Sequence, residues 1–124
     1  MFGGTDAAYA LARKYRIKTA WGTDSLFDAE NARLQGWDLA KMTRWYTPTE
    51  VLVMATSGNA GLLALSGLRS PYQGRLGVVA PGALADLILV DGDPVQDITL
   101  VADAAKAFVV IMKDGRVYRN TVSR

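Results

Sequence analysis

The first half of the chain spaces its hydrophobic residues as helices do, with apolar side chains recurring every three or four positions. Thr5 is placed to cap the first of these helices. Thr47 and Glu50 have the spacing of a capping box, with Pro48 at the first helical position between them. Ser57 is placed to cap a last short helix. The pattern predicts helices over residues 7–14, 37–45, 48–55 and 59–65.

Short apolar runs predict strands elsewhere. Residues 17–21 follow the first helix closely, as a strand does in an αβ unit. Residues 87–90 are continuously apolar, which is typical of a strand covered on both faces. Residues 108–112 and 116–118 are two more expected strands, and the Asp114-Gly115 pair between them is the preferred sequence of a two-residue type I′ hairpin.

The character of the chain changes after Gly77, from mainly helical with one strand to β-rich. We therefore divide it into residues 1–76 and residues 77–124, without requiring that the two parts fold independently. The length of 124 residues is that of one ordinary domain with a sizeable core. The pattern predicts a mixed α/β fold that ends in a small antiparallel sheet.

Composition excludes several classes of function. The chain contains no cysteine and no histidine, which removes disulfides, Cys-ligated zinc, and the commonest general base and metal ligand. The net charge of +2 comes from 14 basic and 12 acidic residues, and the basic ones are scattered, so we expect no nucleic-acid partner. Apolar runs are too short for a membrane span and no export signal is visible, so we expect a soluble, cytoplasmic protein with no membrane partner.

Asp24 lies just past the end of the strand expected at residues 17–21. Active-site groups of parallel α/β proteins gather at this end of their strands, so a catalytic carboxylate is one interpretation. Aspartate after a strand also serves as a turn or cap residue, and the residues alone favour that structural role.

Three later aspartates, Asp91, Asp93 and Asp97, have a spacing that suggests a calcium site. The glycine of this stretch is misplaced for an EF-hand loop and no glutamate closes it, so we expect turn and cap roles instead. Serine catalysis is not expected, because no histidine or neighbouring lysine is present to activate a serine.

Four segments of the chain form a recognisable series. They are Ala20-Trp21-Gly22-Thr23-Asp24-Ser25, then residues 47–56 with Asn59-Ala60 and Leu62-Leu63, then residues 77–79 and 81–91, and last residues 109–117. In this order and spacing they resemble the C-terminal end of the amidohydrolase superfamily, in its imidazolonepropionase and prolidase-like branch. The resemblance extends over nearly the whole chain, and the order of the segments makes it specific.

The resemblance implies the end of a (β/α)8 barrel, in residues 1–76, followed by a β-rich part of a composite sandwich domain, in residues 77–124. Asp24 matches the family's catalytic acid on the eighth strand, which binds a metal and moves a proton from the metal-bound water to the leaving nitrogen. Zinc or another divalent metal and a small amide substrate are implied for the full-length enzyme. Asp24 is the one catalytic and metal-binding residue carried over, and no other cofactor-binding residue is expected.

The family's paired histidines and later metal ligands have no counterpart here. A catalytic zinc site usually takes three protein ligands, so we expect the chain alone to hold no metal and to be inactive. The alternative is a non-catalytic binding or assembly module. The open edges of the strand at residues 17–21 would then favour pairing with a second copy, which predicts a homo-oligomer.

Overall fold

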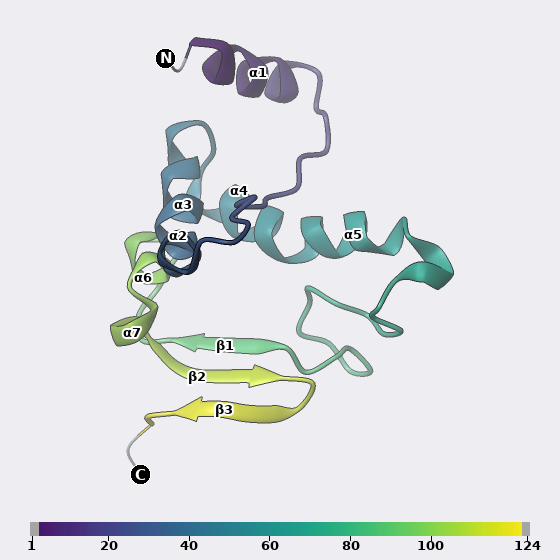
Figure 1. Ribbon diagram of the computed structural model, residues 1–124, viewed down its shortest axis with the longest axis vertical. Helices are drawn as coiled ribbons and strands as arrows, with labels where there is room; N and C mark the ends of the chain where they lie inside the picture. The colour runs from purple at the N-terminus through teal and green to yellow at the C-terminus, as the bar shows by residue number, and fades with distance from the viewer. Residues whose placement is uncertain (1–2, 123–124) are drawn as a thin grey trace.

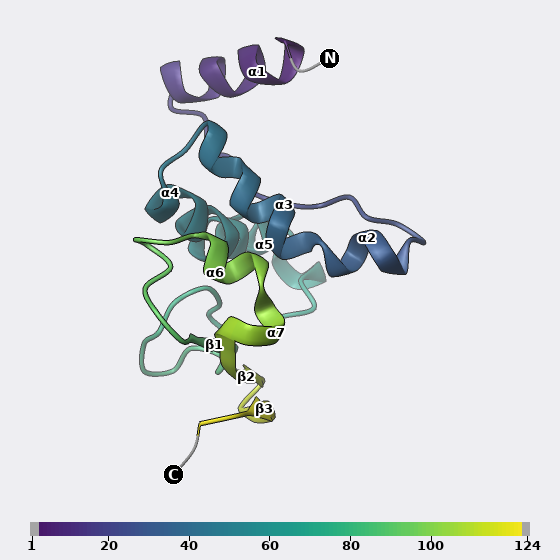
Figure 2. The ribbon, with the colours of Figure 1, turned by 90° about the vertical axis from the view of Figure 1, so that its left-hand side faces the viewer.

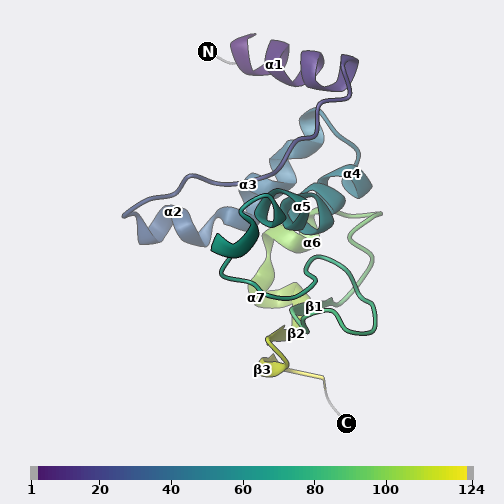
Figure 3. The same ribbon diagram turned by 90° about the vertical axis from the view of Figure 1, so that its right-hand side faces the viewer.

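The computed structural model describes residues 3–122, and its elements lie in three tiers (Figure 1). Helix α1 lies at one end, shorter helices fill the middle, and a three-stranded sheet lies at the other end, an order that two perpendicular views repeat (Figures 2 and 3). No helix among the described residues is long and apolar enough to cross a membrane. The helices are α1 (Gly3–Lys14), α2 (Ala29–Arg33), α3 (Gln35–Lys41), η1 (Met42–Arg44), α4 (Pro48–Val53), η2 (Met54–Gly58), α5 (Asn59–Ala64), η3 (Gly67–Arg69), α6 (Thr99–Ala102) and α7 (Ala104–Ala107); the strands are β1 (Leu87–Val90), β2 (Phe108–Lys113) and β3 (Arg116–Asn120).

Helix α4 begins at the predicted capping box. The Thr47 hydroxyl oxygen accepts a hydrogen bond from the Glu50 N–H at 3.3 Å, and the Glu50 carboxylate accepts one from the Thr47 N–H at 2.8 Å. These bonds satisfy backbone donors that the first helical turn leaves free. The Thr47 N–H, followed by its hydroxyl, also holds the pKa of Glu50 below its ordinary value.

The helical path does not break between α4 and α5, where a new cap was expected at Ser57. The π-helix η2 joins the two helices, and Ser57 lies inside it. The expectation that Ser57 caps α5 was wrong, because the N-cap position belongs to Gly58, whose backbone is helical (φ −63°, ψ −52°) rather than extended. The Thr56 hydroxyl donates to the Leu52 carbonyl at 2.7 Å within this continuous run.

The sheet has the order β1-β2-β3, and both pairs are antiparallel. Asp114 and Gly115 both have positive φ, 49° and 73°, as the predicted type I′ turn requires. The Asp86 carboxylate accepts a hydrogen bond from the Asp114 N–H at 2.6 Å, and the Gly115 N–H donates to the Ala85 carbonyl at 3.1 Å. The hairpin tip is therefore fastened to the residues that lead into β1.

Strand β1 is less buried than its apolar sequence predicts. Ile88 and Leu89 are 54% and 53% exposed, so the expected cover on both faces is absent within residues 3–122. The sheet is the small antiparallel one that the sequence predicts, and such a sheet can leave one face and its edges open to solvent.

The core lies in the middle tier. Val51 of α4 is fully buried, and Met54 of η2 is 6% exposed beside it. Val101 of α6 and Ile98, just before it, belong to the same cluster. Gly36 of α3 lies directly against the Val101 carbonyl, where a β-carbon would clash. The absence of a side chain there allows α3 and α6 to pack closely.

Residues 17–21 do not form the predicted strand. They run on from α1 in irregular backbone, after Arg16 turns the chain at φ 51°. A strand requires a hydrogen-bonded neighbour, and the sheet of the described residues lies beyond the middle helices, at the end of the molecule away from α1 (Figure 1). The local sequence favours extended backbone here, but a strand also needs a partner that the chain does not place beside it.

Helix α1 is attached to the middle tier by aromatic and charged contacts. The Tyr9 and Trp45 rings have centroids 4.5 Å apart. The Asp6 carboxylate accepts two hydrogen bonds from the Arg44 guanidinium, at 3.0 and 2.9 Å, and one from the Trp45 indole N–H at 2.8 Å. The Arg44 bonds, followed by the indole, lower the pKa of Asp6. Arg13 donates to the Trp45 carbonyl from the other end of the same helix face.

Candidate functional site

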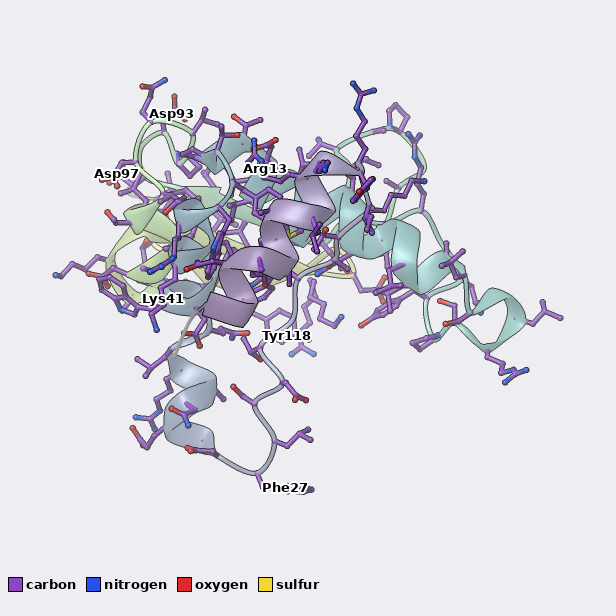
Figure 4. All side chains as sticks on the ribbon, turned by 90° about the horizontal axis from the view of Figure 1, so that it is seen from above. Arg13, Phe27, Lys41, Asp93, Asp97 and Tyr118 are labelled. Carbon is purple, nitrogen blue, oxygen red and sulfur yellow. The ribbon has the colours of Figure 1, made fainter. Side chains whose placement is uncertain are left out.

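Asp24 lies in the exposed loop between the irregular residues 17–21 and α2. Its backbone is left-handed, with φ 54°, and its side chain is exposed. Phe27, also left-handed at φ 58°, lies at the outer tip of this loop, which projects from the body of the molecule (Figure 4). The Ser25 N–H donates to the Thr23 hydroxyl oxygen at 3.4 Å. The loop therefore presents the Asp24 carboxylate to solvent.

The side chain of Asn59 holds the segment before Asp24. The Asn59 side-chain oxygen accepts a hydrogen bond from the Trp21 N–H at 2.8 Å, and its amide nitrogen donates to the Trp21 carbonyl at 2.9 Å. Both bonds are partly buried, and Trp21 packs against the core. Asn59 thus fixes the backbone three residues before Asp24. We call this pair of bonds the Asn59 clamp.

The clamp residue Asn59 is the first residue after the π-helix η2. A β-carbon at Gly58 would lie 3.8 Å from the Thr19 carbonyl, so the segment before Asp24 passes beside this turn. On another side Gly77, with φ 72°, lies so close that its β-carbon would stand 2.6 Å from the Thr56 carbonyl. π-Helical turns frequently occur at functional sites.

The donor set near Asp24 does not make a metal site. The sequence has no histidine or cysteine, and no group of three acidic residues within residues 3–122 could hold a metal ion. Asp24 therefore offers an exposed carboxylate that belongs to no group of three possible ligands among the described residues. The described residues do not fit the catalytic metal that the resemblance implies.

Of the three aspartates after β1, Asp93 and Asp97 perform the turn and cap roles that the sequence predicts. Asp93 accepts a hydrogen bond from the Val95 N–H at 2.8 Å. Asp97 accepts from the hydroxyl of Thr99 at 2.5 Å and from its N–H at 2.9 Å, and these two bonds, the hydroxyl first, lower the pKa of Asp97. Figure 4 shows Asp93 and Asp97 on one loop far from Phe27, the tip of the Asp24 loop.

Two clefts lie away from Asp24. One, of about 560 Å³, separates α5 from the loop around Tyr72 to Arg75, and the other, of about 330 Å³, lies beside the hairpin tip at Asp114. Neither is lined by Asp24 or by Asn59. Nothing in the sequence indicates the clamp, because a side-chain amide can pair with a distant backbone from many positions and has no local pattern.

Comparison with known proteins gives no match to a family model or to a curated protein. Solved structures do match. An amidohydrolase has a TM-score of 0.79 and 29% sequence identity over 94% of this chain. A prolidase solved with N-methylphosphonate-L-proline has a TM-score of 0.78 and 27% identity, also over 94%. The chain resembles part of an amidohydrolase. Ochratoxinase from A. niger shares the fold, with a TM-score of 0.72 and 23% identity over 91% of the chain.

This amidohydrolase-like chain spans about a quarter of the length of its structural relatives. It covers 26% of the amidohydrolase and of the prolidase, and 24% of ochratoxinase. A C-terminal fragment of such an enzyme would have this extent, so the predicted resemblance to amidohydrolase and prolidase-like proteins is confirmed. The α/β class with a small antiparallel sheet is confirmed as well.

Proposed function

We propose that the chain is the C-terminal part of a metal-dependent amidohydrolase that hydrolyses amide or other C–N bonds. The observation that supports this function is the match to an amidohydrolase and to a prolidase over 94% of the chain. In this assignment residues 1–76 end the barrel and residues 77–124 belong to the sandwich domain. The metal, zinc or another divalent ion, is held mainly by ligands outside the chain, and the chain alone is inactive.

Asp24 is the residue of this chain that we assign to the chemistry and to the metal. Its carboxylate makes no hydrogen bond or ion pair within the described residues, and it is open to solvent. A general acid or a metal ligand must be free to contact the reacting atoms in this way. Turn and cap aspartates of the same chain, such as Asp93 and Asp97, instead have their oxygens engaged by backbone N–H groups.

One of the same relatives supports a proposal for the substrate class. The prolidase was solved with N-methylphosphonate-L-proline, a compound that joins a phosphonate to proline. A small amide, with an N-acyl proline among the candidates, is therefore the substrate class that we propose. Specificity in barrel enzymes resides largely in the loops after the strands. The preferred acyl group is therefore to be identified by assaying a panel of substrates.

Complementation tests this function. The 29%-identical amidohydrolase is truncated by the quarter that this chain matches, and this chain is then co-expressed with the remainder. Co-purification is scored first, and zinc content and hydrolysis of cyclic amides, dipeptides and N-acyl prolines are scored next. We expect a zinc-dependent hydrolase from the pair, none from either piece, and none with Asp24→Asn. A co-purifying pair that turns over equally well with Asp24→Asn would refute the role of Asp24.

A non-catalytic assembly module is the second candidate. Residues 17–21 have no strand partner, and the sheet exposes Ile88 and Leu89 on β1. Exposed apolar groups on an edge strand favour pairing with another copy, which would make the chain a homo-oligomer. Light scattering over a range of concentrations tests this candidate. A compact monomer at high concentration would count against it.

A further inference from the structure

The two bonds of the Asn59 clamp have the pattern by which one residue pairs with another in an antiparallel sheet. In an antiparallel sheet, a hydrogen-bonded pair of residues exchanges two N–H···O bonds, so each residue donates once and accepts once. Trp21 does the same with Asn59, donating at 2.8 Å and accepting at 2.9 Å. The segment has no neighbouring strand within residues 3–122, so a side chain supplies the two bonds that a strand would supply.

Asparagine is suited to this task by its chemistry. Its side chain carries one acceptor oxygen and one donor nitrogen in a rigid planar fork, which matches the N–H and C=O of a single residue. Serine or alanine at this position would leave both backbone groups of Trp21 partly buried and unpaired. An aspartate would accept from the Trp21 N–H but, when ionised, would face the Trp21 carbonyl without a proton to donate.

The surroundings of Asn59 fix the direction of the clamp. Gly58 brings the helix backbone close to the Thr19 carbonyl, and Gly77 supports η2 from another side at the Thr56 carbonyl. Helix α5 then starts at Asn59 itself. The Asn59 side chain therefore extends from a turn whose backbone is packed against other segments of the chain.

Asp24 follows Trp21, the residue that the clamp anchors, by three residues. Its φ of 54° lies in the left-handed region, which is uncommon for residues with a β-carbon, although aspartate adopts it more readily than most. The bond from the Ser25 N–H to the Thr23 hydroxyl is long, at 3.4 Å, and supports the turn weakly. The strong fixed point nearest to Asp24 is Trp21, and Asn59 holds it.

We infer that Asn59 is a positioning residue, which clamps the Trp21 backbone and thereby fixes the conformation in which Asp24 is presented. The catalytic meaning of this inference rests on the function proposed above. The clamp itself does not, and it can be tested on the 124-residue chain without any turnover.

The experiment is NMR spectroscopy of the chain, with two local readouts. The first is the protection of the Trp21 amide against hydrogen exchange. The second is the intraresidue HN–Hα NOE of Asp24, which is intense at positive φ because the two protons lie close together. For Asn59→Ala we expect Trp21 protection to fall roughly ten- to thirty-fold, as loss of two net hydrogen bonds implies, and the Asp24 NOE to weaken. Ser57→Ala, in the neighbouring turn, should change neither.

Asn59→Asp separates positioning from general stability. A protonated carboxyl has one acceptor oxygen and one O–H donor and so repeats the fork of the amide, whereas the ionised form lacks the donor. We therefore expect both readouts in this variant to return to wild-type values at acid pH, below the carboxyl pKa, and to be lost above it. Exchange rates are compared as protection factors, which remove the intrinsic pH dependence of exchange.

Two results would overturn the inference. One is an Asn59→Ala variant that keeps both the Trp21 protection and the Asp24 NOE. The other is an Asn59→Asp variant whose readouts do not respond to pH. Asp24→Asn leaves the clamp atoms unchanged, so its inactivity in the complementation experiment and the state of the clamp are independent results. Failure of the proposed function would therefore leave the clamp measurements intact, and the reverse is also true.

Discussion

Truncating Val51 to alanine tests how much of the fold's stability comes from the cluster that joins α3, α4 and α6. Val51 is the one described side chain that is fully buried and large, at 0% exposure. Loss of two methyl-sized groups removes about 1.6 kcal/mol of transfer free energy, and the cavity left behind raises the total to roughly 2–3 kcal/mol. That is a large part of the ~5–15 kcal/mol that holds an ordinary domain together.

Val53→Ala is the matched control. It is the same substitution two residues further along α4, at a side chain that is 51% exposed. The gain in helix propensity is equal in both variants and cancels in their difference. Urea unfolding should place Val51→Ala about 2 kcal/mol below Val53→Ala, with equal m-values. A difference below about 0.5 kcal/mol would refute the reasoning, because it would mean that the cluster collapses around the cavity without loss.

Three further predictions concern the cap, the attachment of α1 and the support of η2. Thr47→Ala should cost about 1 kcal/mol in urea unfolding, because the Glu50 N–H loses its acceptor. The pKa values of Asp6 and Glu50 are lowered in the fold. The stability that these two carboxylates add to the fold is therefore complete above their unfolded pKa values and is lost as pH falls through the folded ones. Tm should drop below about pH 5, and it should drop less steeply in Asp6→Asn. Gly77→Ala should destabilise by at least about 1 kcal/mol more than Gly82→Ala, since both have positive φ but only Gly77 contacts η2; equal effects would show that the contact relaxes freely.

The sequence predicted the elements whose signals are local. The Thr47 to Glu50 capping box and the Asp114-Gly115 turn form as expected, because each is fixed by a few neighbouring residues and their allowed backbone angles. Strands β2 and β3 follow from that turn. Asp24 was identified as the candidate residue from its place in a series of segments, and its exposed, unpaired carboxylate is compatible with that role.

The errors concern pairings between distant residues. The strand expected at residues 17–21 required a neighbouring strand, which a local apolar run cannot provide. The cap expected at Ser57 required the helix to stop, but the chain continues through the π-helix η2, against which Gly77 packs. The sequence predicts only that Asn59 begins a helix, since nothing in its immediate sequence indicates that it pairs with Trp21, 38 positions earlier.

The parts that shape the Asp24 loop and the parts that would use it lie in different places. Trp21, Asn59 and the η2 turn all belong to the described chain, so the backbone before Asp24 has a defined position without any neighbouring strand. The described residues contribute the exposed carboxylate of Asp24, and they form no group of three acidic residues that could hold a metal ion. If the proposed function holds, the chain contributes a pre-positioned acid and the remainder of the enzyme contributes the metal. Complementation should then depend on Asn59 as well as on Asp24, with Ser57→Ala as the variant that leaves zinc-dependent turnover unchanged.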